Sequence, residues 1–122
     1  MTGEGKPRLV LVVDDDEMIR RLVRAVLEAD EFEVAEARDG QAALELASET
    51  HPAVVVLDVM MPGLDGVEVC RRLDPQVKVV ILTARDDPKL ETEARAAGAD
   101  AFMTKPFSPM ELLDLVGELM AK

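Results

Sequence analysis

Three short apolar runs constrain the fold of this chain most. They span residues 9–13, 53–57 and 79–82, and they consist almost entirely of Val, Ile and Leu without polar alternation. Each run has the length of a β-strand, and a strand that is apolar at every position needs cover on both faces. The pattern therefore predicts a parallel sheet between two layers of helices. Two weaker strands are expected at residues 32–36 and 101–104.

Segments with helical spacing lie between the expected strands. Apolar residues three or four positions apart follow Asp16, Asp39-Gly40 and Asp87-Pro88, and the last pair is a typical cap and first helical residue. These stripes are Ile19, Leu22, Val23 and Val26; Ala43, Leu44 and Ala47; and Leu90, Ala94 and Ala97. A shorter helix is expected at residues 67–73, where Asp74-Pro75 ends it.

The last helix has the clearest start. Ser108-Pro109-Met110-Glu111 forms a capping box with proline at the first helical position. Apolar residues then give the helix a buried face, namely Leu112, Leu115, Val116 and Leu119. Five strands that alternate with five helices predict an α/β domain with right-handed crossovers.

Reactive side chains follow the central and last strands at the point where each strand ends. They are Asp14, Asp15, Asp16, Asp58, Thr83 and Lys105. In an open parallel sheet, ligands bind beyond the carboxyl ends of the strands, so these groups are expected to converge. A helix cap accounts for Asp16. It does not account for a run of three carboxylates, which repel one another unless a cation binds there. Carboxylate oxygens suit Mg²⁺.

Asp58 is the candidate nucleophile of this group. A carboxylate can attack phosphorus and form an aspartyl-phosphate. The transferred phosphoryl oxygens then need positive charge, which a metal ion and the ammonium of Lys105 would supply. The hydroxyl of Thr83 can donate a hydrogen bond to an incoming phosphoryl oxygen. The residues themselves thus indicate phosphoryl transfer to Asp58.

The charge balance narrows the function classes. The chain has 122 residues, with 14 Lys and Arg against 25 Asp and Glu, so its formal net charge is −11. Such an acidic domain repels phosphate backbones and anionic lipid, which argues against direct binding of nucleic acid or membrane. The single cysteine excludes an internal disulfide and fits a cytoplasmic location. Residues 1–7 are expected to form a flexible N-terminal tail before a domain at 8–122.

Four motifs occur in a fixed order along the chain: VVDDD, LDVMMPGLDG, ILTA and FMTKPF. In this order they resemble the receiver domain of bacterial response regulators, and the resemblance extends from about Arg8 to Met120. It implies a flavodoxin-like (βα)₅ fold, with a five-stranded parallel sheet in the order 2-1-3-4-5 and helices on both faces. It also implies a signalling switch of a two-component system that promotes its own phosphorylation and dephosphorylation, and not an enzyme.

The resemblance also implies a role for each site residue. Asp15 would bind Mg²⁺ directly, Asp14 would hold a metal-bound water, and Asp58 would be both the phosphoacceptor and a metal ligand. The main-chain carbonyl of Met60 would be a further ligand. Lys105 would pair with Asp58, and the peptide bond between Lys105 and Pro106 would be cis. Thr83 and Phe102 would be the switch residues.

The implied partners are a sensor histidine kinase or a histidine phosphotransfer protein as phosphodonor. A downstream effector would bind through the last strand and the last two helices, and the isolated domain is expected to be mostly a monomer. Two alternatives remain, a pseudo-receiver that is not phosphorylated and a flavodoxin-like cofactor binder. A pseudo-receiver would have a substitution in the acidic pair Asp14-Asp15, at Asp58 or at Lys105, and this chain has no substitution at these positions. The second would need a glycine-rich or hydroxyl-rich phosphate loop in place of three aspartates.

Overall fold

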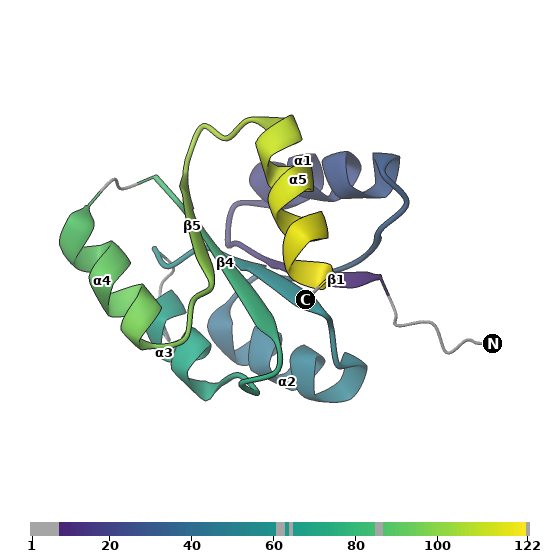
Figure 1. The fold of residues 1–122 in the computed structure, drawn as a ribbon. Helices are drawn as coiled ribbons and strands as arrows, with labels where there is room; N and C mark the ends of the chain where they lie inside the picture. Colours follow the sequence, from purple (N-terminus) through teal and green to yellow (C-terminus); the bar gives the residue numbers. More distant parts are fainter. Residues whose placement is uncertain (1–7, 61–62, 64, 85–86, 122) are drawn as a thin grey trace.

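The computed structural model describes residues 8–60, 63, 65–84 and 87–121. The expected N-terminal tail at residues 1–7 therefore lies outside the described residues. Strands and helices alternate without exception in this part of the chain (Figure 1). The elements are β1 (Leu9–Val13), α1 (Glu17–Ala29), β2 (Glu33–Ala37), α2 (Gly40–Thr50), β3 (Val54–Leu57), α3 (Gly66–Arg72), β4 (Lys78–Thr83), α4 (Pro88–Ala96), β5 (Ala101–Thr104) and α5 (Pro109–Met120).

The five strands form one parallel sheet in the order β2-β1-β3-β4-β5. This confirms the predicted fold class and strand order. The first and last strands match their predicted ranges, whereas β2 begins and ends one residue later than predicted. The fourth strand is longer than its apolar run and includes Thr83, which was expected to follow it. The first residue of β2, Glu33, and both end residues of β4, Lys78 and Thr83, are polar, so hydrophobicity alone does not mark these strand ends.

Helices cover both faces of the sheet, as the unbroken apolar strands predict. Figure 1 shows α1 and α5 on one face and α2, α3 and α4 on the other. Alternate residues of each central strand point to the two layers, so Leu11 and Val55 join one buried cluster while Val10 and Val54 join the other. Because every position of β3 is buried, the sheet has no solvent-facing side at its centre.

Helix caps fix where the chain leaves each strand end. Asp16, Asp39, Asp65, Asp87 and Ser108 each accept a hydrogen bond from a main-chain N–H in the first turn of the helix that follows. Such caps satisfy donors that have no partner within the helix. The predicted caps at Asp16, Asp87 and Ser108 are thereby confirmed, although the structure shows only the Ser108 half of the predicted capping box among the described residues.

One apolar stripe differs from the prediction. On α1, Val23 and Leu27 are buried, whereas Leu22 is 50% exposed. The other predicted residues of the stripe, Ile19, Val23 and Val26, pack against the core as expected, so only Leu22 was assigned to the wrong face. Leu22 therefore belongs to the outer surface of the helix together with Met18, which is 79% exposed.

Two glycines permit a close approach and a turn at opposite ends of the sheet. A Cβ on Gly66 would lie 2.4 Å from Cα of Val59, so only glycine lets the start of α3 pass so close to the loop after β3. Gly98 has a φ of +116° and follows the end of α4 ahead of β5, a conformation that glycine adopts without strain. The structure contains no helix among its described residues that is long and apolar enough to cross a membrane.

Candidate functional site

Four parallel strands, β1, β3, β4 and β5, bring the predicted site residues to one edge of the sheet. The main-chain N–H of Asp58 continues the ladder beyond β3 and donates to the carbonyl of Val13 at 3.0 Å. The N–H of Asp14 donates in the same way to the carbonyl of Ala37 on β2, at 3.2 Å. These bonds fix both aspartates at the carboxyl ends of buried strands, as the sequence predicts.

The acidic cluster consists of two buried carboxylates and one exposed carboxylate. Asp14 and Asp58 are only 3% and 5% exposed, while Asp15 lies at the surface. One oxygen from each of the three lies within 4.8 Å of the others. Carboxylates this close repel one another, and burial strengthens the repulsion because little water screens it.

Lys105 neutralises part of this charge. Its ammonium donates to Oδ2 of Asp14 at 2.8 Å and to Oδ2 of Asp58 at 3.4 Å. The lysine is held at the end of β5 by its own N–H, which donates to the Thr83 carbonyl at 2.7 Å, and the bond to Pro106 is cis as predicted. The resemblance implied a pair with Asp58. The structure shows a shared cation that lies closer to Asp14.

Main-chain groups hold the other oxygens of the buried pair. Oδ1 of Asp14 accepts the N–H of Asp16, and Oδ1 of Asp58 accepts the N–H of Met60, each at 2.9 Å. Met60 thus adjoins the nucleophile candidate, and whether its carbonyl binds a metal stays a prediction. Residues 61, 62 and 64 of the LDVMMPGLDG motif lie outside the described residues.

The electrostatic balance at Asp58 is unfavourable to its charged form. Burial raises the pKa of the Asp58 carboxyl above its ordinary value, and the charge of Asp14 raises it further. The hydrogen bond from Met60 and the charge of Lys105 only partly oppose this. Burial alone would lower the pKa of Lys105, but its bond to Asp14 and the nearby Asp58 charge outweigh burial and raise it. The lysine therefore stays protonated while the cluster keeps an excess of negative charge.

The donor set fits a hard divalent cation. Three carboxylates against one ammonium leave net negative charge at the edge of the sheet, and the exposed Asp15 keeps one side open to water. Mg²⁺ commonly takes one or two carboxylates and retains several waters. The arrangement has the ligand type, charge and solvent access that such an ion needs.

The predicted switch residues lie on neighbouring strands. Thr83 is fully buried at the end of β4 and pairs in register with Thr104, two residues beyond Phe102 on β5. Phe102 is half-buried and packs against the same cluster as Leu90 of α4. The structure therefore brings both residues to the strand pair that ends at Lys105, while a motion that couples them remains a prediction.

One positioning contact at the site was not predicted from the sequence. The guanidinium of Arg20, on α1, donates to the Asp14 carbonyl at 2.9 Å and to Glu36 of β2 at 3.1 Å. Arg24 binds the other oxygen of Glu36 at 2.6 Å, and this bond is the main cause of the lowered pKa of Glu36. Arg20 thus ties the acidic loop to the edge strand. An arginine one helical turn after the aspartate run was the available sign.

Family comparison agrees with this geometry. A sequence profile described as the response regulator receiver domain matches residues 10–117. The chain belongs to the response regulator receiver domain family. The chain is therefore a receiver domain of a two-component response regulator, and such a domain is a signalling switch.

Individual relatives give the same result. The receiver domain is 40% identical over 115 residues to the transcriptional regulatory protein SrrA of Staphylococcus aureus, an alignment that covers 93% of this chain and 48% of SrrA. The chain thus spans about half the length of the curated relatives it matches.

Two solved structures illustrate the likeness. The Vibrio cholerae chemotaxis protein CheY4 is 32% identical with a TM-score of 0.87, covering 93% of this chain and 99% of that one. The receiver domain of the Francisella response regulator 1452 is 36% identical with a TM-score of 0.86, covering 95% and 98%.

The single histidine and the single cysteine of the chain both have structural explanations outside the site. His51 is exposed and caps the end of α2 in a left-handed conformation. Cys70 is a free cysteine buried on α3, and burial raises the pKa of its thiol to about 11, so it is protonated at neutral pH. Neither side chain belongs to the site at the sheet edge.

Proposed function

We propose that this receiver domain accepts a phosphoryl group on Asp58 in a Mg²⁺-dependent reaction. The main support for this proposal is the position of the buried Asp58 carboxylate, which lies 3.4 Å from the Lys105 ammonium and beside Asp14 and Asp15. A sensor histidine kinase or a histidine phosphotransfer protein would supply the phosphoryl group. The receiver would act in the cytoplasm, where its single thiol stays reduced.

In the proposed step, a carboxylate oxygen of Asp58 attacks the phosphorus of a phosphohistidine. The P–O bond forms as the P–N bond breaks, and the bond electrons return to the imidazole nitrogen. Asp14, Asp15, Asp58 and the Met60 carbonyl would hold Mg²⁺, which when bound neutralises charge on the phosphoryl oxygens. The ammonium of Lys105 would pair with the negative charge on the phosphoryl oxygens, because it already donates to Asp58.

The proposed switch uses the buried Thr83 hydroxyl. New phosphoryl oxygens on Asp58 would accept a charge-assisted hydrogen bond from it. Movement of Thr83 would open space toward Phe102, which is half-buried and has no hydroxyl that needs a partner. The altered surface would then be β5 with α4 and α5, where a downstream effector would bind.

Acetyl phosphate tests the acceptor directly. With Mg²⁺, we expect one phosphoryl group per chain, stable in acid and released by base or hydroxylamine, as an acyl phosphate requires. Asp58→Asn should abolish labelling, while Asp30→Asn at the exposed end of α1 should leave it unchanged. Equal labelling of the Asp58 variant would assign the phosphoryl group elsewhere. A wild-type protein that takes no label would support the pseudo-receiver alternative.

A further inference from the structure

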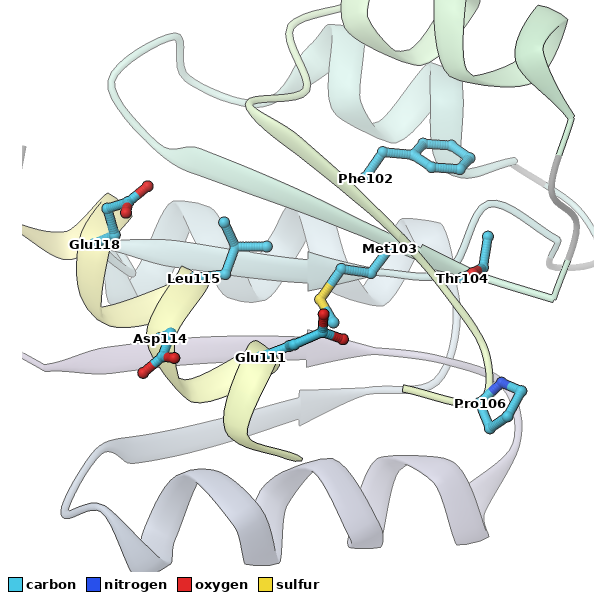
Figure 2. A pocket seen from close by; sticks show the side chains of 8 residues that line it. All are labelled: Phe102, Met103, Thr104, Pro106, Glu111, Asp114, Leu115 and Glu118. Atoms are coloured by element: carbon cyan, nitrogen blue, oxygen red, sulfur yellow. The ribbon is translucent and has the colours of Figure 1, made fainter. Parts of the chain in front are cut away.

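A groove of about 510 Å³ lies between the edge strand β5 and α5. Its lining combines apolar and acidic side chains, namely Phe102, Met103, Thr104, Pro106, Glu111, Asp114, Leu115 and Glu118. Figure 2 shows Phe102 and Met103 leaving opposite sides of β5, with the three acidic residues along α5. Met103 and Leu115 are half-buried, so the groove has an apolar floor open to solvent.

The acidic residues share one face of α5. Asp114 and Glu118 lie three and seven positions after Glu111, and all three are exposed. Leu115 lies between Asp114 and Glu118. On two other helices, acids have intrahelical arginine partners: Glu17 pairs with Arg21 on α1, and Glu91 with Arg95 on α4. The exposed Glu45 and Glu49 on α2 form no ion pair among the described residues, so α2 supplies two positions of the matched control variant.

No such partner compensates the acidic face of α5. Across the described part of the chain, Glu111, Asp114 and Glu118 form no ion pair, and the sequence of α5 contains neither Lys nor Arg. Glu118 also lies in the last turn of α5, where the helix dipole disfavours an anion. A cation placed there would therefore remove two unfavourable interactions at once.

We propose that the β5–α5 groove binds a basic segment of a partner protein, with Lys or Arg opposite the three carboxylates and one or two apolar side chains on the floor. The effector role of this surface rests on the proposed function, since Phe102 is both part of the lining and a switch residue. The charge complementarity does not depend on phosphorylation. It is carried by the unpaired acids and the apolar floor alone.

A second copy of this chain is the less suitable occupant. In a two-fold pair, the same surface meets itself, so the three carboxylates of one copy would face those of the other. None of the eight lining residues is basic, and each copy carries a formal net charge of −11. Such like-charge contacts select against self-pairing.

Two synthetic helix-forming peptides serve as probes, one of leucine and lysine and one of leucine and glutamate. We expect the lysine peptide to bind the unphosphorylated protein and to shift amide NMR signals of β5 and α5. The glutamate peptide should not bind. Binding of both peptides, or shifts spread evenly over the molecule, would overturn the proposal. Light scattering that shows a dimer closed through this face would favour the second copy instead.

Matched variants separate a site from general attraction to an acidic protein. The groove variant combines Glu111→Gln, Asp114→Asn and Glu118→Gln, and the control combines Glu45→Gln, Glu49→Gln and Asp30→Asn. Three exposed charge pairs together are worth about tenfold in affinity, so the groove variant should lose about that much and the control less than about twofold. Equal losses in both variants would overturn the proposal.

A third variant tests the floor without a charge change. Leu115→Gln should weaken the lysine peptide, and unchanged affinity would remove the apolar part of the proposal. All titrations are repeated in the Asp58→Asn background. Binding that persists there supports the groove even if Asp58 proves not to be the phosphoacceptor, so the two proposals fail separately.

Discussion

Neutralising Asp58 should stabilise the folded protein, although it removes the proposed reactive group. Asp58 is 5% exposed and lies within 4.8 Å of the Asp14 carboxylate. At an effective dielectric constant of about 20, that separation gives a repulsion of at least about 3 kcal/mol. The attraction between Asp58 and the Lys105 ammonium, at 3.4 Å, is about 5 kcal/mol at the same dielectric constant. Asp15 adds a second, partly screened repulsion, so the charges nearly balance.

Burial then decides the sign. Desolvation of the charged carboxylate is the largest cause of the raised pKa of Asp58. We therefore expect Asp58→Asn to raise the free energy of unfolding by about 1–2 kcal/mol at pH 7 without Mg²⁺. Asp14→Asn should raise the free energy of unfolding by less, because it also removes the 2.8 Å contact with Lys105. Urea unfolding followed by circular dichroism measures both.

The pH dependence gives an independent check. Because folding raises the pKa of Asp58, the folded wild type binds this proton more tightly than the unfolded chain. Wild type therefore gains stability as the pH falls through the folded pKa, and the gain is complete below the ordinary value of 3.8. Asparagine has no such proton, so the advantage of Asp58→Asn should shrink between pH 7 and pH 4.

Added Mg²⁺ should offset most of the stability advantage of Asp58→Asn. At ten times its dissociation constant, a bound ion stabilises the wild type by about 1.4 kcal/mol, and the variant should gain much less. An Asp58→Asn protein that is no more stable than wild type at pH 7 in the presence of a chelator would refute the reasoning. So would an advantage that grows as the pH falls.

Three further predictions concern the edge strand, the switch and self-association. Folding lowers the pKa of Glu36, so its bonds to Arg24 and Arg20 contribute stability above pH 4.5 that is lost as the pH falls through the folded pKa. Glu36→Gln should cost about 1–2 kcal/mol at pH 7 in urea unfolding, and a cost that does not shrink in acid would contradict this. Thr83→Ala should still be phosphorylated, but beryllofluoride should no longer shift the NMR signals around Phe102; an unchanged response would remove Thr83 from the switch. Light scattering at micromolar concentration should show a monomer before phosphorylation, and a stable dimer would be the contrary result.

Fold and site followed from different properties of the sequence. The unbroken apolar runs gave the parallel sheet, because only burial on both faces tolerates a strand such as VVVL. The caps at Asp16, Asp87 and Ser108 gave the helix starts, since these side chains satisfy main-chain donors locally. Strand ends then placed Asp14 and Asp58 at one edge without any knowledge of their contacts.

Contacts between distant side chains were harder to predict. The position of Lys105 after β5 indicates that its ammonium reaches the acidic edge, but not which carboxylate it approaches more closely. Main-chain donors do not decide that choice, because the Asp14 and Asp58 loops each supply one donor at 2.9 Å. Arg20 was missed for a similar reason, because its partners are a main-chain carbonyl and an edge-strand residue with no pattern of their own.

The shared lysine bears on how the site would respond to phosphorylation. Before transfer, Lys105 lies closer to Asp14 than to Asp58, at 2.8 Å against 3.4 Å. A phosphoryl group on Asp58 would add negative charge on that side and draw the ammonium toward it. Asp14 would then lose its nearest cation, so its charge would have to be met by a metal ion in the cluster. Phosphoryl transfer and metal retention would thus be coupled through one side chain. On this reasoning, Lys105→Met should weaken the dependence of Mg²⁺ affinity on beryllofluoride, which NMR titration of the Asp14 amide can measure; an unchanged dependence would place the coupling elsewhere.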